Sequence, residues 1–142
     1  MSCYHSAVLE APIETVWADI KDFHNMSWAK GVIETCEKVD QTSGLETGAK
    51  RLLNGGIHET LLEIDQDVYT FTYAITDGPE PISKNCVKDY TGTVGLTPIT
   101  VGNKTLIEWS SIYESDKDDV VKEFCDPIYV ALLKAMQNHF NQ

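Results

Sequence analysis

Basic side chains are scarce in this sequence of 142 residues. It contains 11 Lys and Arg against 22 Asp and Glu, and its formal net charge is −11. Proteins that bind nucleic acids or anionic membrane surfaces use clustered Lys and Arg to contact phosphates. The charge balance therefore argues against both partners. The net negative charge favours a protein that stays in solution as a monomer or a weak homodimer.

Long apolar runs are also missing. No stretch approaches the roughly 20 residues of a membrane-spanning helix, so we expect no membrane span. The first residues lack the basic region and apolar stretch of a signal peptide. Four cysteines lie far apart without a CxxC motif, at Cys3, Cys36, Cys86 and Cys125. We therefore expect reduced thiols and a cytoplasmic protein.

Motifs of cofactor and metal chemistry are absent as well. The sequence has no phosphate-binding loop, no dinucleotide-binding fingerprint and no Ser-His-Asp constellation. His5, His24 and His139 show no metal-ligand spacing with any Cys, Asp or Glu. We expect neither a cofactor nor a metal.

The composition that remains is typical of one globular domain, expected over residues 1–142. Apolar residues make up 42% and charged residues 23%, an ordinary balance. The order of elements begins with a strand over 3–10. Pro12 then opens a helix whose apolar residues recur at helical spacing up to Ile20. A second short helix is expected over 22–28.

Strands and turns fill the middle of the chain. Gly55-Gly56 is a tight hairpin signal, and the clearest period-two alternation lies at 69–76. The expected strands cover 32–39, 49–54, 57–64, 69–76, 87–96 and 104–115. With the first strand they make about seven, and their short connections predict an antiparallel, strongly curved sheet. The alternation in the last strand leaves open whether Trp109 or Ser110 faces inward.

The C-terminal segment predicts a long amphipathic helix that begins near Ser115. Pro127 lies inside it, so we expect a kink there or a restart with Asp126 as a new cap. The expected apolar stripe consists of Val120, Phe124, Ile128, Ala131, Leu132, Ala135 and Met136. The predicted fold is α+β: a curved antiparallel sheet of about seven strands wraps around this helix, with two short helices after the first strand.

Several short motifs follow one another in the order typical of the START-like (SRPBCC) superfamily. They are Ala11-Pro12-x-x-x-Val16-Trp17, Gly48-x-x-Arg51, Ile57-x-Glu59, Asp89-Tyr90-x-Gly92 and Trp109. The sequence resembles this superfamily, which has the helix-grip fold, over nearly its whole length. The bacterial polyketide cyclase/dehydrase-type branch matches better than the birch pollen allergen-like branch, whose glycine-rich loop is degraded here to residues 42–45. Hormone receptors of the superfamily hold a carboxylate with a lysine, and Glu34 stands at the matching position.

The resemblance implies an internal cavity between the sheet and the C-terminal helix. Carried over by position, it places on the cavity wall Glu34, Arg51, Glu59, Tyr73, Ile75, Tyr90, Phe124, Ile128 and Leu132. It also implies that the ligand is a small hydrophobic molecule, such as a lipid, a polyketide or an aromatic metabolite, and not a carboxylate hormone.

The strand pattern by itself places three polar residues together. A turn centred on Gly55 pairs Arg51 with Glu59, and the next turn pairs Glu59 with Tyr73. Paired residues share one face of a sheet, with Cβ atoms about 5 Å apart. The three should therefore form a row across neighbouring strands. The face that carries this row also carries Phe71 and Ile75.

Two interpretations of this row stay open. Arg51 and Glu59 are either a structural salt bridge or part of a site. In a site, Arg51 offers hydrogen-bond donors to a carbonyl or enolate oxygen. Glu59 serves as general acid or base if burial raises its pKa, and Tyr73 or Tyr90 donates a proton. Arg51, Glu59 and Tyr73 are thus the candidate catalytic residues.

Three functions remain open. The first is a binding module for a small hydrophobic molecule. The second is an enzyme that cyclises or dehydrates a polyketide-like substrate, the chemistry that the resemblance implies. A distant third is a protein-interaction domain, since some helix-grip proteins act as co-chaperones. The fold alone does not choose among them.

Overall fold

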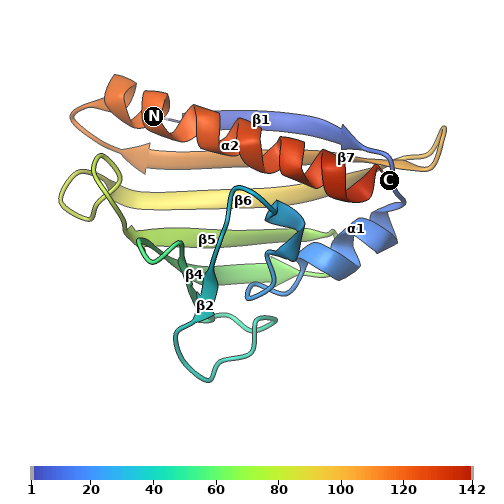
Figure 1. Ribbon diagram of the computed structural model, residues 1–142, viewed down its shortest axis with the longest axis horizontal. Helices are drawn as coiled ribbons and strands as arrows, with labels where there is room; N and C mark the ends of the chain where they lie inside the picture. The colour runs from blue at the N-terminus through green and yellow to red at the C-terminus, as the bar shows by residue number, and fades with distance from the viewer. Residues whose placement is uncertain (1, 142) are drawn as a thin grey trace.

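The described part of the chain, residues 2–141 of the computed structural model, folds into one seven-stranded antiparallel sheet with helices on its inner side (Figure 1). The strands are β1 (Ser2–Leu9), β2 (Cys36–Lys38), β3 (Lys50–Leu53), β4 (Ile57–Asp65), β5 (Thr70–Asp77), β6 (Lys88–Ile99) and β7 (Lys104–Glu114). The helices are α1 (Ile13–Ile20), the 3-10 helix η1 (Ser27–Ala29) and α2 (Asp118–Phe140). The spatial order β1-β7-β6-β5-β4-β3-β2 brings the first strand beside the last. The expected helix-grip architecture is confirmed.

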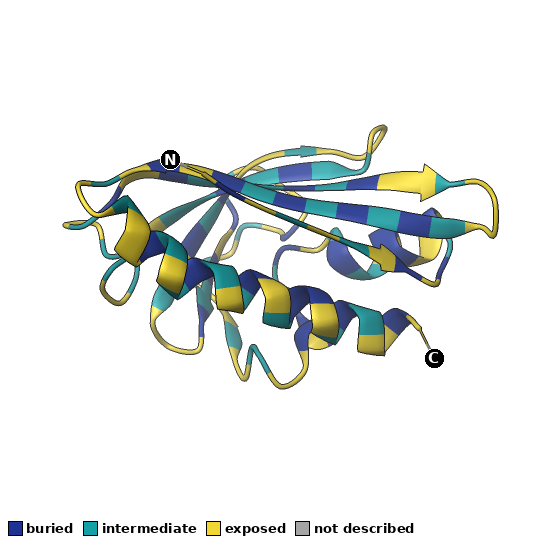
Figure 2. Ribbon diagram, turned by 90° about the horizontal axis from the view of Figure 1, so that it is seen from above, coloured by how far each residue is buried: buried dark blue, intermediate teal, exposed yellow. Residues whose placement is uncertain are grey.

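Helix α2 presents a buried stripe to the sheet, visible as the dark side of the helix in Figure 2. The buried residues are Val121, Cys125, Tyr129, Leu132, Leu133, Met136 and Phe140. The expected stripe was one residue out of phase in its first half, since Val120 is exposed and Phe124 and Ile128 are only half-buried. The expected stripe left out Cys125 and Tyr129, because a search for apolar residues passes over side chains that carry polar atoms.

Pro127 lies inside a continuous helix, and no new cap forms at Asp126. Proline lacks the backbone N–H that would bond the carbonyl four residues earlier, which belongs to Glu123. Both Pro127 and Glu123 are exposed. The carbonyl that the proline leaves free therefore belongs to the exposed side of α2, and the helix continues through the proline without a restart.

The segment before β2 differs from the prediction. The strand expected over 32–39 is reduced to Cys36–Lys38, because the side chain of Asn54 takes the backbone groups that a strand ladder would use. Asn54 Oδ1 accepts from the backbone nitrogens of Glu34 and Thr35, at 2.7 and 3.2 Å. Its Nδ2 donates to the carbonyl of Val32 at 3.0 Å. Glu34 is consequently exposed in a loop. The helix expected over 22–28 is likewise shorter, a single 3-10 turn in η1.

A β-bulge sets the pairing of β4 with β5. Leu61 pairs with Tyr73 and Glu63 pairs with Thr72, so Leu62 is an extra residue without a partner. Bulges of this kind shift the register while they bend the strand. The expected pairing of Glu59 with Tyr73 is wrong by two residues, since Glu59 pairs with Ile75. The hairpin is centred between Asp67 and Val68 instead of on Gln66, which is a shift of three residues, and the one-residue bulge reduces it to two. A shift of two keeps the alternation of faces, so these side chains still point to the same side.

Candidate functional site

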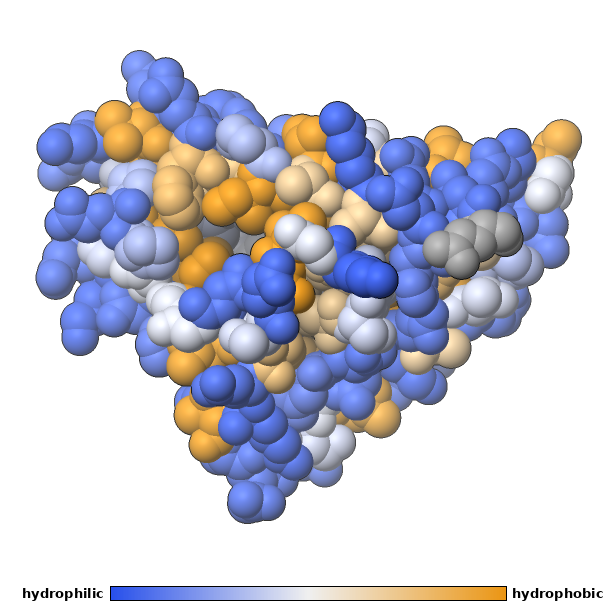
Figure 3. Space-filling view, viewed as in Figure 1, coloured by the Kyte–Doolittle hydropathy of each residue, from blue (hydrophilic) through white to orange (hydrophobic). Residues whose placement is uncertain are grey.

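A cavity of about 50 Å³ lies between the inner face of the sheet and α2. Half-buried aliphatic and aromatic residues surround its opening, which we call the mouth: Ile33, Ile57, Ile75, Phe124 and Ile128. Buried residues with polar atoms lie deeper, which we call the floor: Arg51, Glu59, Tyr73, Tyr90, Trp109 and Tyr129. Figure 3 shows the apolar side chains gathered on the face toward the viewer, beneath the N-terminal half of α2. The site therefore combines an apolar entrance with a polar floor.

The only arginine of the sequence, Arg51, forms a buried ion pair with Glu59. The β3–β4 hairpin pairs the two residues directly, as its turn predicted, and Asn54 and Gly55 in that turn both have positive φ. Arg51 Nε and Nη2 lie 2.8 and 2.6 Å from Glu59 Oε1. Nη1 donates to the carbonyl of Phe23 at 3.0 Å, and the Phe23 ring stacks 3.8 Å from the guanidinium carbon. The cation is thus held by three different contacts.

Glu59 is only partly satisfied by this pairing. Both Arg51 nitrogens bind Oε1, and no described residue donates to Oε2. Burial raises the pKa of the Glu59 carboxyl, and the positive charge of Arg51 opposes that rise. A buried carboxylate with one free oxygen facing a cavity can accept a hydrogen bond from a bound molecule or exchange a proton with it.

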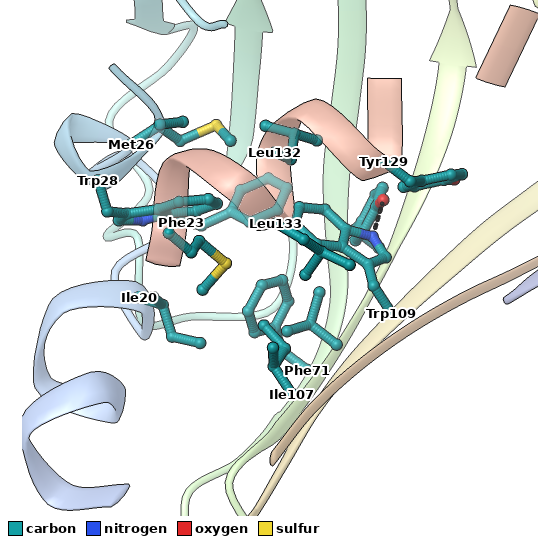
Figure 4. Packing of buried hydrophobic residues seen from close by; sticks show 14 of the residues in the cluster. Ile20, Phe23, Met26, Trp28, Phe71, Ile107, Trp109, Tyr129, Leu132 and Leu133 are labelled. Carbon is teal, nitrogen blue, oxygen red and sulfur yellow. Dashed lines mark hydrogen bonds between the residues drawn. The ribbon is translucent and has the colours of Figure 1, made fainter. Parts of the chain in front are cut away.

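Tyr73 and Trp109 form the second polar element of the floor. Trp109 Nε1 donates to the Tyr73 hydroxyl at 2.8 Å, the bond drawn from the Trp109 ring in Figure 4. Trp109 and Tyr113 face inward, whereas Ile112 is exposed, which answers the question that the alternation left open. Burial raises the pKa of Tyr73 well above its usual value, so the phenol stays protonated at neutral pH. Its ring lies over Gly92, its partner on β6.

A cluster of tyrosines closes the floor toward α2. The hydroxyls of Tyr90 and Tyr129 share a hydrogen bond, and Tyr90 also donates to Ser111 Oγ at 3.3 Å. Burial raises the pKa of both phenols, and it raises the pKa of the neighbouring Cys125 thiol to about 11. The Cys125 thiol is therefore protonated at neutral pH and is a poor nucleophile.

The structure brings most of the expected site residues together. Arg51, Glu59, Tyr73, Ile75, Tyr90, Phe124, Ile128 and Leu132 line the cavity. Glu34 does not, because its segment is a loop and its side chain is exposed. Phe71 is buried beneath the cavity against Trp17 and Phe23 and does not reach it.

Tyr129 and Trp109 are the floor residues that the sequence interpretation missed. Tyr129 follows Cys125 by four residues and precedes Leu132 by three, so helical spacing places all three on one face. Trp109 alternates with Thr105, Ile107, Ser111 and Tyr113, all of which are buried. Both signals are present in the sequence, but each includes polar residues and is weak without the fold.

Two kinds of feature are absent from the described residues. No helix within 2–141 is long and apolar enough to cross a membrane. In the same range, no group of three or more His, Cys, Asp and Glu is arranged to hold a metal ion.

The curved sheet, the long helix in its concavity and the cavity between them define a helix-grip protein of the START-like superfamily. Residues 2–141 match the profile of the family described as polyketide cyclase / dehydrase and lipid transport. The chain belongs to this family. A search of curated proteins finds no match.

Solved structures agree with this assignment. A protein from Nitrosospira multiformis is 35% identical, with 99% of this chain and 96% of the other aligned and a TM-score of 0.94. The protein XoxI from Bacillus cereus is 25% identical over 99% of this chain and 96% of its own, with a TM-score of 0.79. A protein from Bacillus thuringiensis, 23% identical over 100% of both chains with a TM-score of 0.80, shares the fold.

Proposed function

We propose that this protein binds a small, mostly apolar molecule in the cavity between the sheet and α2. The observation that carries the proposal is the free Oε2 of Glu59 on the floor of an otherwise apolar cavity. Ligand sites combine apolar walls with a few placed polar groups in this way. The family description, which includes lipid transport, is in keeping with it.

The size of the cavity limits how the ligand enters. A volume of about 50 Å³ holds a few water molecules, whereas pockets for drug-sized ligands enclose about 300–1,000 Å³. A ligand of that size must move side chains at the mouth. Phe124 and Ile128 are only half-buried on one turn of α2, and we propose that they move aside first.

Native mass spectrometry of freshly purified protein, followed by titration with an apolar fluorescent probe, tests the proposal. We expect either a small molecule that co-purifies or saturable probe binding at one site. Ile128→Trp fills the mouth and should abolish that binding. Val130→Trp is the matched control, because Val130 lies on the exposed side of the same helix. Binding that survives Ile128→Trp would place the ligand elsewhere and reject the cavity.

A second candidate function is acid–base catalysis on a polyketide-like substrate in the same cavity. The raised pKa of Glu59 and the protonated Tyr73 beside it favour this candidate. Glu59→Gln separates the two functions when substrates of this class are incubated with the protein. A binder loses mainly affinity, whereas an enzyme loses turnover by orders of magnitude while its affinity changes little.

We propose further properties from the charge and the cysteines of the chain. Residues 1–142 form one START-like domain, monomeric or weakly dimeric, without nucleic-acid partners, as its net charge of −11 suggests. The four cysteines are free thiols, in keeping with a cytoplasmic location. Size-exclusion chromatography with light scattering tests the oligomeric state, and a stable dimer at micromolar concentration would correct it.

A further inference from the structure

Two hydrogen-bonding groups on the cavity floor lack a protein partner. Glu59 Oε2 receives no hydrogen bond from any residue within 2–141. Tyr73 accepts a bond from Trp109, but the described chain offers no acceptor for its own hydroxyl proton. Both side chains are almost fully buried, and both line the cavity. Among the described residues, Trp17 Nε1 is the only fully buried side-chain nitrogen or oxygen without a hydrogen bond. Glu59 Oε2 is therefore open to the cavity, where a water molecule or a ligand can complete its hydrogen bonding.

The two side chains start from the same inner face of the neighbouring strands β4 and β5. Leu61 is the direct partner of Tyr73 on β4, and Glu59 is two residues along the same strand on the same face. Diagonal neighbours of this kind lie about 7–8 Å apart at the backbone, within reach of long side chains. The guanidinium carbon of Arg51 lies 5.6 Å from the centre of the Tyr73 ring, which places the ion pair beside the phenol.

We infer that the ligand carries a neutral hydroxyl group at its buried end, an inference that rests on the proposed binding function. The hydroxyl donates its proton to Glu59 Oε2 and accepts the proton of Tyr73. A hydroxyl both donates and accepts, so one group completes both partners. The rest of the ligand is apolar and faces the residues of the mouth, such as Phe124 and Ile128. Phenols and apolar alcohols form this class.

The same floor selects against anionic ligands. Arg51 is the only cationic side chain that lines the cavity in the described part of the chain, and its charge is already paired with Glu59. A ligand carboxylate would lie beside the Glu59 carboxylate, where like charges repel in a poorly solvated site. An ether leaves Oε2 unpaired, because it accepts a hydrogen bond but donates none.

Three ring-matched probes test the inference: 4-ethylphenol, 4-ethylanisole and 4-ethylbenzoate. Each is titrated at neutral pH into the ¹⁵N-labelled protein, and the indole signal of Trp109 reports binding at the floor. We expect the phenol to bind at least about tenfold more tightly than the ether, the usual effect of one hydrogen bond to a charged group. We expect the benzoate to bind at least about tenfold more weakly than the phenol.

Two variants test whether the preference for the phenol over the ether comes from Glu59 Oε2. Glu59→Gln presents an amide in place of the free carboxylate oxygen, and we expect it to reduce the preference for phenol over ether to within about threefold. Glu63→Gln is the matched control, because Glu63 is exposed on the same strand, and it should keep the preference. If Glu59→Gln does not fold, the affinities of the three probes for the wild-type protein still test the inference.

Each other outcome overturns a defined part of the inference. Equal affinities for phenol and ether, or tightest binding of the benzoate, would reject the hydroxyl class and leave cavity binding intact. An unchanged preference in Glu59→Gln would reject Glu59 as its source. If none of the three probes shifts the Trp109 signal, the proposed binding function fails and the inference fails with it.

Discussion

The ring of Tyr73 occupies the space that a side chain at Gly92 would need. A Cβ added at Gly92 would lie less than 3.0 Å from Tyr73 Cζ and from its hydroxyl oxygen. The two residues are direct partners on β5 and β6, so the glycine lets the phenol lie flat against the sheet. From that position Tyr73 accepts the hydrogen bond of Trp109. The glycine thereby shapes the floor of the cavity.

Gly92→Ala should therefore destabilise the protein. A methyl group at that position displaces a rigid ring, and forced overpacking costs about 1–3 kcal/mol. Urea denaturation followed by tryptophan fluorescence measures the loss. Gly95→Ala on the same strand is the control, since the nearest atom to its added Cβ is Thr70 Oγ1 at an ordinary 3.6 Å. Equal stabilities of the two variants would contradict the steric account.

Removing one member of the buried ion pair should lower the free energy of unfolding more than removing one charge on the surface. Arg51→Met leaves the Glu59 carboxylate buried and unpaired, which costs about 3–5 kcal/mol. The double variant Arg51→Met/Glu59→Leu removes both charges and should recover most of that loss. Chemical denaturation of the single and double variants gives the coupling between the two residues.

The surface pair of Lys104 and Glu10 gives the comparison. Its charges lie 3.1 Å apart, but both side chains are exposed. Lys104→Met should change the free energy of unfolding by less than about 1 kcal/mol. A loss in Lys104→Met as large as that in Arg51→Met would show that burial of the Arg51–Glu59 pair is not what matters.

The pKa of Glu59 predicts the direction of a pH effect. Burial raises it above its usual value of 4.5, so the folded state binds the proton more tightly than the unfolded state. The stability that this proton contributes is present below the unfolded pKa and is lost as pH rises through the folded pKa. The stability of wild type relative to Glu59→Gln should fall as pH rises from about 4 and then level off.

The contribution of Asp77 to stability should change with pH in the opposite direction. Backbone N–H groups of Lys84 and Gly78 bond its carboxylate at 3.1 and 3.0 Å and lower its pKa below 3.8. Its contribution is present above the unfolded pKa and is lost as pH falls through the folded pKa. Denaturation of Asp77→Asn and Glu59→Gln over the same pH series compares them. Parallel pH profiles for the two variants would refute the assignment for Glu59.

Tyr73→Phe should destabilise the protein, because it removes the hydrogen bond that Trp109 donates to Tyr73. The change removes the acceptor and leaves the buried indole N–H of Trp109 unpaired, at a cost of about 1–3 kcal/mol. Tyr4→Phe removes a hydroxyl from an exposed tyrosine that bonds Glu108, and it should change stability by less than about 0.5 kcal/mol. Thermal and urea unfolding measure both. A neutral Tyr73→Phe would mean that water replaces the phenol as acceptor.

Local signals in the sequence predicted the ion pair. The Gly55-Gly56 turn determines which residues of β3 and β4 face each other, because a hairpin's register follows from its turn. The pairing of Arg51 with Glu59 therefore follows from residues close together in the chain. The face of Tyr73 was also predictable from strict alternation, although its direct partner was not.

Contacts between distant segments decided the rest of the site. The bulge at Leu62 moves Tyr73 opposite Leu61, and nothing in the local sequence marks it. Asn54 draws the backbone around Glu34 into a loop, so that residue leaves the expected wall. Tyr129 reaches the floor only because the phase of α2 depends on how the whole helix packs on the sheet.

Periodicity and turn chemistry were enough to predict the order of elements, the antiparallel sheet with its C-terminal helix, and the pairing of Arg51 with Glu59. Both signals act between residues close along the chain, so they can be recognised in the sequence. The volume of the cavity, the inward face of Trp109 and the free oxygen of Glu59 emerged only in the folded molecule. Those properties depend on which atoms of different strands and helices come into contact, and close packing makes that outcome sensitive to shifts of a single residue.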